Sequence, residues 1–167
     1  FILSTVEYDD PRIAFLMEVK FPFVAFGCAN TNWDYPYIDF DFNDGMQQVI
    51  DHLVGLGHRA IGVVAGVEGF RPLDMRLEGY YYAMQEFDLP VDPTWVVRGS
   101  SRVASGYEQV ERLLQLPLSK RPTALVCLSD ALAVGAMNAT RNTGLKVGQE
   151  LAITGYADIP FVYYLQH

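Results

Sequence analysis

The residues best suited to chemistry in this sequence follow the segments that resemble β-strands. Small or polar residues come after each expected strand, at Gly27-Cys28, Gly66, Gly99-Ser100-Ser101, Ser129-Asp130 and Gly155-Tyr156-Ala157-Asp158. In an open parallel sheet the carboxyl ends of the strands share one edge, where helix N-termini converge and ligands bind. The five endings together predict a ligand-binding crevice. Any one of them alone would indicate only a turn, and Asp130 alone would equally fit an N-cap.

Arg76 is the strongest single candidate for a ligand contact. It falls at the start of an expected helix, where the macrodipole opposes a positive charge, so a partner in the crevice would explain its position. A guanidinium fork suits vicinal hydroxyls or a carboxylate. A sugar ring bound between Arg76 and Asp130 would satisfy both side chains. The alternative is a salt bridge from Arg76 to Asp74 or Glu78.

The sequence offers little for catalysis. Its three histidines, His52, His58 and His167, have no partners at metal-ligand spacing. It contains neither a G-x-S-x-G elbow nor a Walker A loop. Gly55-Leu56-Gly57-His58-Arg59-Ala60 has glycines spaced as in a dinucleotide fingerprint, but it follows a helix and precedes a strand, the reverse of the order that phosphate binding needs. We therefore expect a protein that is not an enzyme and holds no cofactor or metal.

Composition excludes several classes of protein. The 167 residues are 50% hydrophobic and 19% charged, which is too apolar for a disordered chain. No apolar run reaches the roughly 18 residues of a membrane span, and no basic segment precedes Phe1, so we expect a soluble, cytoplasmic chain. The net charge of -8 argues against contact with nucleic-acid phosphates by this stretch. Cys28 and Cys127 lie in apolar runs, as buried reduced thiols do.

Strand-like and helix-like segments alternate along the chain. Expected strands cover residues 1–3, 23–26, 61–65, 95–97, 124–128 and 151–154, with a run of alternating character at 37–42. Helical periodicity extends over residues 43–57, 73–87, 103–114 and 131–142. This order predicts an α/β fold with doubly wound parallel sheets and helices on both faces. Acidic residues within 39–43 interrupt the pattern and indicate a crossing between two lobes.

Several motifs occur in order over nearly the whole chain. They are His52-Leu53, Gly55-Leu56-Gly57-His58-Arg59-Ala60-Ile61-Gly62, Arg76-Leu77-Glu78-Gly79-Tyr80, Ser105-Gly106-Tyr107, Arg121-Pro122-Thr123-Ala124, Ser129-Asp130-Ala131-Leu132-Ala133-Val134-Gly135-Ala136 and Ile153-Thr154-Gly155-Tyr156-Ala157-Asp158-Ile159-Pro160. Taken together, these motifs resemble the effector-binding domain of LacI/GalR-type transcriptional regulators.

The resemblance implies a type I periplasmic-binding-protein-like fold, with two α/β lobes and a small effector in the cleft between them. Residues 1–42 would be the latter part of the N-terminal lobe and residues 43–160 the C-terminal lobe, with 161–167 starting the return crossing. We expect the chain to be a fragment, incomplete at both ends. Such regulators are homodimers that bind DNA through a headpiece not contained in this sequence, and their effectors shift the lobe geometry.

The resemblance also assigns roles to residues. Arg76 matches the family's effector-contacting arginine, Asp130 matches an aspartate that binds sugar hydroxyls, and Ser129 stands where Asn is common. One departure is Ala157, which replaces the first Asp of the usual Gly-Tyr-Asp-Asp and leaves only Asp158.

Two further departures from the family pattern reduce the number of residues expected to contact a sugar. Ser101 stands where an aromatic residue often stacks on the effector, and Cys28 occupies a ligand-facing position that is often charged. Phe70, Asn30 and Trp33 in neighbouring loops are the candidates to compensate.

The leading hypothesis from sequence is the effector-sensing domain of a LacI-type DNA-binding regulator, a repressor, that binds a small sugar or related metabolite. The alternative is the periplasmic sugar-binding component of a transporter, which shares the fold. The N-terminus of the full-length protein distinguishes them, since a regulator has a helix-turn-helix there and a transport component has a signal peptide.

Overall fold

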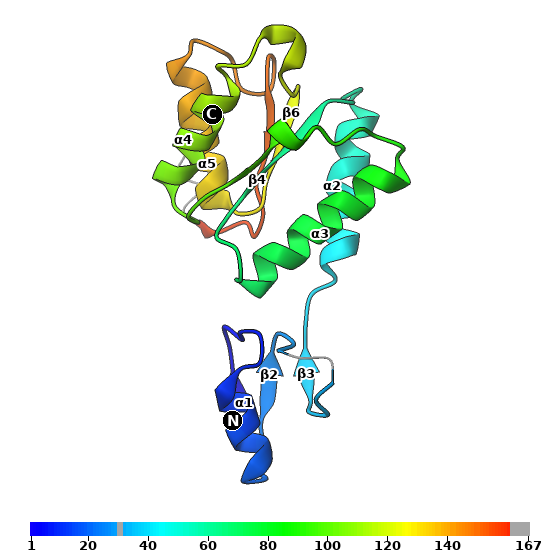
Figure 1. Cartoon of the computed structure of the whole chain (residues 1–167), viewed down its shortest axis with the longest axis vertical. Coiled ribbons are helices and arrows are strands. Elements are labelled where there is room, and N and C mark those ends of the chain that lie inside the picture. The colour runs from blue at the N-terminus through cyan, green and yellow to red at the C-terminus, as the bar shows by residue number, and fades with distance from the viewer. Residues whose placement is uncertain (30–31, 161–167) are drawn as a thin grey trace.

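A computed structural model describes residues 1–29 and 32–160, which form two lobes (Figure 1). The N-terminal lobe has a three-stranded parallel sheet in the order β1-β2-β3, made of β1 (Ile2–Leu3), β2 (Val24–Phe26) and β3 (Tyr37–Ile38). One helix, α1 (Pro11–Glu18), packs against this sheet through the fully buried Ile13.

The sequence analysis missed α1, although a local signal marks its start. Asp10 is the N-cap, where its Oδ1 accepts a 3.0 Å hydrogen bond from the backbone nitrogen of Arg12, and Pro11 occupies the first position of the helix. Both residue types are favoured at these positions. With only eight residues and one of them buried, the helix shows no clear apolar periodicity.

The larger lobe is built on a four-stranded parallel sheet in the order β5-β4-β6-β7. Its strands are β4 (Ile61–Ala65), β5 (Val96–Arg98), β6 (Ala124–Cys127) and β7 (Ala152–Thr154). Val63 pairs with Val96 on one side and with Val126 on the other, so β4 lies inside the sheet. Every residue of β4 and β6 is buried, as continuous apolar runs in parallel sheets require.

Helices cover both faces of this sheet, which confirms the doubly wound architecture (Figure 1). On one face α2 (Phe42–Gly55) and α3 (Arg71–Glu86) share a core with β4 and β6. On the other face α4 (Val103–Leu113) and α5 (Asp130–Asn142) pack against the same strands. Short 3-10 turns at Pro93–Trp95 and Leu118–Lys120 precede β5 and β6.

Most element boundaries agree with the sequence-based expectation to within one or two residues, and the starts of α2 and α5 differ for a clear local reason. The run at 37–42 forms only the two-residue strand β3, because Asp41 caps α2 by accepting a 2.9 Å hydrogen bond from the backbone nitrogen of Asp44. The N-cap of α5 is Ser129 rather than Asp130, since the Ser129 hydroxyl accepts a 3.4 Å hydrogen bond from the backbone nitrogen of Leu132.

Within the described ranges, the chain passes between the lobes once, through residues 39–41 between β3 and α2 (Figure 1). The expected return crossing at 161–167 lies outside the described residues. None of the described helices combines the length and apolar character that a membrane crossing requires.

Candidate functional site

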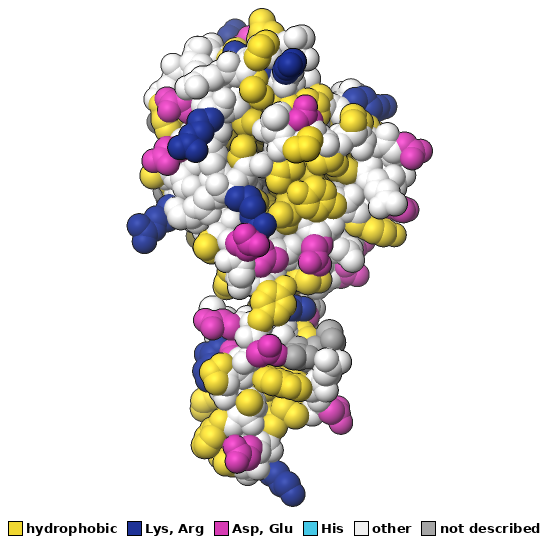
Figure 2. Space-filling model, in the orientation of Figure 1, with side chains coloured by type: hydrophobic (Ala, Val, Ile, Leu, Met, Phe, Trp, Pro, Cys, Tyr) yellow, Lys and Arg dark blue, Asp and Glu magenta, His cyan; other side chains and the backbone are white. Residues whose placement is uncertain are grey.

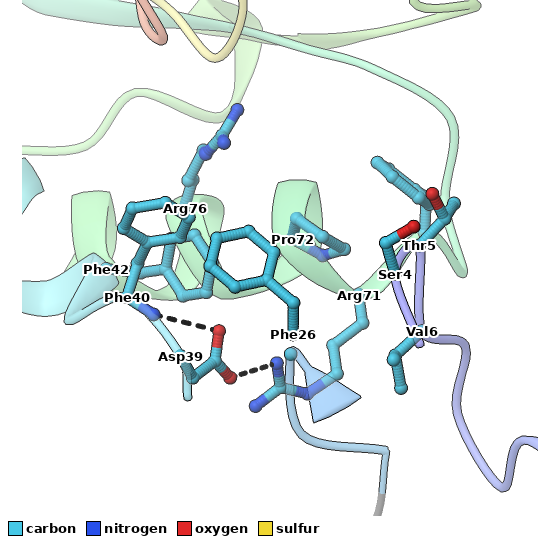
Figure 3. Close-up of a pocket in the computed structure, with 12 residues that line it drawn as sticks. Ser4, Thr5, Val6, Phe26, Asp39, Phe40, Phe42, Arg71, Pro72 and Arg76 are labelled. Atoms are coloured by element: carbon cyan, nitrogen blue, oxygen red, sulfur yellow. Dashed lines mark hydrogen bonds and ion pairs between the residues drawn. The ribbon is translucent and has the colours of Figure 1, made fainter. Parts of the chain in front are cut away.

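A cavity of about 370 Å³ lies where the two lobes meet (Figure 3). Its walls are Ser4, Thr5, Val6, Phe26 and Gly27 from the N-terminal lobe, Asp39 and Phe40 from the crossing, and Phe42, Phe70, Arg71, Pro72 and Arg76 from the larger lobe. These segments follow β1, β2, β3 and β4, so the cavity lies beyond the carboxyl ends of strands, as the sequence predicted. Its volume is within the range of about 300–1,000 Å³ that is common for small-molecule sites.

Arg76 lies in the second turn of α3, slightly farther into the helix than predicted, and its side chain reaches toward the end of β6. Its Nη1 donates a 2.7 Å hydrogen bond to the carbonyl oxygen of Leu128, directly after β6. Its Cζ is 3.8 Å from the ring centroid of Tyr156 and 5.6 Å from that of Phe42. The guanidinium is therefore held, partly buried, between two aromatic side chains.

The surface ion pair considered for Arg76 does not form. Asp74 instead accepts a 2.7 Å bond from Nη2 of Arg98, and within the described part of the chain Arg76 makes no ion pair. Burial lowers the pKa of the Arg76 guanidinium, while the neighbouring Tyr156 acts in the opposite direction. The Nε atom of Arg76 is buried and has no hydrogen-bond partner among the described residues. The described chain thus leaves one donor of this guanidinium unsatisfied.

Asp39 and Arg71 form an ion pair that sequence reasoning missed. Oδ2 of Asp39 accepts from Nη1 of Arg71 at 2.7 Å (Figure 3). The same oxygen accepts from the backbone nitrogen of Cys28 at 3.1 Å. The aspartate therefore links the end of β2, the crossing and the start of α3. The residues are 32 positions apart, and the sequence signalled Asp39 only as an acidic interruption.

Four phenylalanines give the cavity an aromatic wall. Phe26 and Phe40 are 47% and 58% exposed and meet edge to face, with ring centroids 5.3 Å apart. Phe42 is buried, and Phe70 is 36% exposed. Hydrophobic side chains accordingly lie at the surface where the lobes join (Figure 2). Aromatic side chains that line a cavity while partly exposed can stack on a flat ligand face.

Asp130 and Asp158 belong to a neighbouring hollow rather than to the interlobe cavity. That hollow is lined by Asp130, Gly155, Tyr156, Ala157 and Asp158. Asp130 is buried, and its Oδ2 accepts a 2.8 Å hydrogen bond from the backbone nitrogen of Ile159. Its own backbone nitrogen donates to the carbonyl oxygen of Tyr156 at 3.1 Å. Asp130 therefore anchors the loop that positions Tyr156 against Arg76.

Comparison with known proteins shows the family to which this chain belongs. The family model described as "Periplasmic binding protein-like domain" matches residues 50–167. The chain belongs to this family. It is 31% identical to the probable HTH-type transcriptional repressor ExuR of Bacillus subtilis (strain 168), over 98% of this chain and 49% of that protein. The chain therefore spans about half the length of this relative.

Solved structures place the periplasmic binding protein-like domain with the LacI-type regulators. A regulatory protein of the LacI family from Chloroflexus aggregans superposes with a TM-score of 0.95 and 44% identity, covering 99% of this chain and 59% of that one. The lac repressor dimer bound to operator and the anti-inducer ONPF superposes with a TM-score of 0.82 and 26% identity, covering 95% of this chain and 54% of that one. These matches confirm the resemblance seen in the sequence and identify a LacI-family effector-binding domain.

The structure of this LacI-type domain brings only part of the predicted site together. Of the nine predicted residues, Arg76 and Phe70 line the interlobe cavity. Cys28 is buried directly after β2 and reaches the cavity wall only through its backbone bond to Asp39. Ser129 lies between Leu128, which binds Arg76, and Asp130.

The remaining predicted residues lie elsewhere. Trp33 packs against the core of the N-terminal lobe, Ser101 is exposed beside Gly66, and Asn30 lies outside the described residues. Their effector contacts stay predictions. In the parts of the chain that the structure describes, no group of three or more His, Cys, Asp or Glu side chains is arranged to hold a metal ion.

Proposed function

We propose that this chain is the effector-sensing part of a LacI-type DNA-binding transcriptional regulator, a repressor, and that its interlobe cleft binds a small sugar-like metabolite. The observation that carries the proposal is the position of Arg76. Its guanidinium is held by Leu128, Phe42 and Tyr156 at the cavity and makes no ion pair within the described chain. Arginine supplies several donors in a fixed plane, which suits hydroxyl and carboxylate groups.

The same proposal assigns each part of the chain to a lobe of the regulator. Residues 1–42 act as the latter part of the N-terminal lobe and residues 43–160 as the C-terminal lobe, with 161–167 leading into the return crossing. The regulator acts as a homodimer and contacts DNA through a headpiece that is not contained in this sequence. The net charge of -8 supports this division, because nucleic-acid phosphates attract Lys and Arg. Such a protein acts in the cytoplasm, where the chromosome is.

Regulation follows from where the cavity lies. An effector that contacts Phe26 on one side and Arg76 on the other touches both lobes, so it favours one relative arrangement of the lobes over others. A ligand shifts such an equilibrium only by its difference in affinity between the states. The change in lobe geometry then alters how the two headpieces of a dimer meet their half-sites. This role needs binding and release but no chemical step.

The experiment is a titration of the full-length protein with a carbohydrate panel, combined with a gel shift on its operator. We expect one panel member to bind and to change DNA binding, and Arg76→Ala to abolish that response while the fold is kept. A protein whose DNA binding responds to no panel member would contradict the proposal. A signal peptide in place of a helix-turn-helix at the full-length N-terminus would favour the transporter component instead.

A further inference from the structure

The charges that line the interlobe cavity do not cancel. Three charged side chains line it, namely Asp39, Arg71 and Arg76. Asp39 and Arg71 neutralise each other across 2.7 Å, with 17% and 12% of their side chains exposed. Arg76 is left as the uncompensated charge among them. Asp130 is the carboxylate that acts on Arg76 through space, but it forms no ion pair with Arg76 and accepts from Ile159.

The free edge of the Arg76 guanidinium has a specific shape. Nη1 donates to the Leu128 carbonyl oxygen, which leaves the edge formed by Nε and Nη2. Nε is buried without a partner among the described residues. Two parallel N–H donors on one edge match the two oxygens of a carboxylate, and such bidentate, charge-assisted pairs are among the strong hydrogen-bonded contacts of a guanidinium. A ligand carboxylate at this edge would supply the acceptor that the folded chain does not provide.

The rest of the cavity is not built for a second charge. Phe26, Phe40 and Phe70 present partly exposed rings, which suit a flat apolar face. Ser4 and Thr5 lie across the cavity from Arg76 and bring hydroxyl groups to its opposite side (Figure 3). The site thus combines one cation, one aromatic wall and two hydroxyls.

Resting on the proposed function, we infer that the effector is a small carboxylic acid with one flat apolar face, bound through its carboxylate by Arg76 and against the phenylalanine wall. A sugar acid has this combination of groups, because the C–H face of its ring is apolar and its hydroxyls reach Ser4 and Thr5. A neutral sugar of the same shape lacks the charge-assisted contact with Arg76.

The test compares acids with their neutral counterparts by calorimetry on the full-length protein. The pairs are glucuronate with glucose, galacturonate with galactose, and benzoate with benzamide. We expect the acid of at least one pair to bind about tenfold or more tightly than its neutral partner, as a charge-assisted contact predicts. Raising NaCl from about 0.05 to 0.5 M should weaken the acid severalfold and leave the neutral compound unchanged.

Variants identify the contact. Arg76→Gln should bring the affinity of the acid to within about threefold of the neutral compound, whereas Arg112→Gln, the same change on the exposed surface of α4, should leave the preference intact. Arg76→Lys keeps the charge but loses the two-donor edge and should recover only part of the preference. Circular dichroism shows whether each variant is folded.

Three results would overturn the inference. They are equal affinity for acid and neutral compound in all three pairs, an acid preference that survives in Arg76→Gln, and tighter binding of glucose 6-phosphate than of every acid. A neutral sugar that binds as tightly as its acid and changes operator binding would contradict the inference that the effector is a carboxylic acid, while leaving the proposed sensing function in place. Operator binding that responds to no compound at all would contradict both.

Discussion

Asp39 and Arg71 close the base of the interlobe cavity, with Oδ2 and Nη1 2.7 Å apart although the residues are 32 positions apart in the chain. The pair joins the crossing segment to the first residue of α3. The same Oδ2 also accepts from the backbone of Cys28, so one carboxylate fixes the N-terminal lobe against the larger one. Both side chains are largely shielded from solvent, which limits screening of the pair.

The first prediction concerns this link. Asp39→Asn removes the charge from a shielded ion pair and leaves Arg71 without its counter-charge, so it should lower the free energy of unfolding by about 1–3 kcal/mol. Urea denaturation measures the effect. Asp51→Asn, on the exposed side of α2, is the matched control and should stay within about 0.5 kcal/mol of the unmodified protein. Equal effects of the two variants would show that the link contributes nothing.

The second prediction concerns the ring beside Arg76. Tyr156→Ala removes the ring 3.8 Å from the guanidinium carbon and part of the core contact with α2 and α3. We expect a loss of about 1–3 kcal/mol of stability. Tyr156→Phe keeps the ring and should retain most of that stability. Thermal and urea denaturation of both variants provide the measurement, and a Tyr156→Phe protein as weak as Tyr156→Ala would assign the effect to the hydroxyl instead.

The third prediction tests the crossing of α4 and α5. A side chain at Gly135 would collide with the backbone at Val103 and Tyr107, so Gly135→Ala should force the helices apart. Overpacking of this kind costs about 1–3 kcal/mol. Gly55→Ala at the end of α2, where a Cβ meets no atom within 4 Å, should instead be neutral or stabilising by up to about 1 kcal/mol. If both variants unfold at the same urea concentration, the close helix contact is not needed.

The fourth prediction is a pH dependence at the start of α1. The hydrogen bonds from Arg12 lower the pKa of Asp10 from 3.8 to about 2. A carboxyl whose pKa is lower in the folded state stabilises the fold above its unfolded pKa and loses that contribution as pH falls toward about 2. Asp10→Asn should therefore be destabilising at pH 7 and progressively less so from pH 4 to pH 2. Urea titrations at these pH values check this, and a difference that does not shrink with acid would contradict it.

Sequence reasoning found most of the larger lobe because local signals there agree with the tertiary fold. The apolar run of β4 and the helical periodicity of α2 and α5 each depend on neighbouring residues, although the N-caps of these two helices were not identified correctly. The same reasoning missed α1, because a helix of eight residues with a single buried position has little periodicity to detect. Its Asp-Pro start was the available signal.

The candidate site also contains residues that sequence reasoning found and residues that it missed. Arg76 could be singled out from its place in an expected helix, and the structure brings it to the cavity. Trp33 and Ser101 could not be placed from their positions in the sequence, and the structure locates them away from the cavity lining. Three members of the aromatic wall, Phe26, Phe40 and Phe42, escaped sequence analysis because each of them also fits an ordinary apolar position, whereas Phe70 was predicted.

By itself, the order of residues determined the α/β class, the parallel strands and the edge at which polar groups collect, since these depend on periodicity and on contacts between near neighbours. Only the tertiary structure decided that Asp39 pairs with Arg71, while Arg76 forms no ion pair within the described residues. Which carboxylate meets which arginine depends on the approach of segments that are far apart in the chain, and no local pattern records that distance.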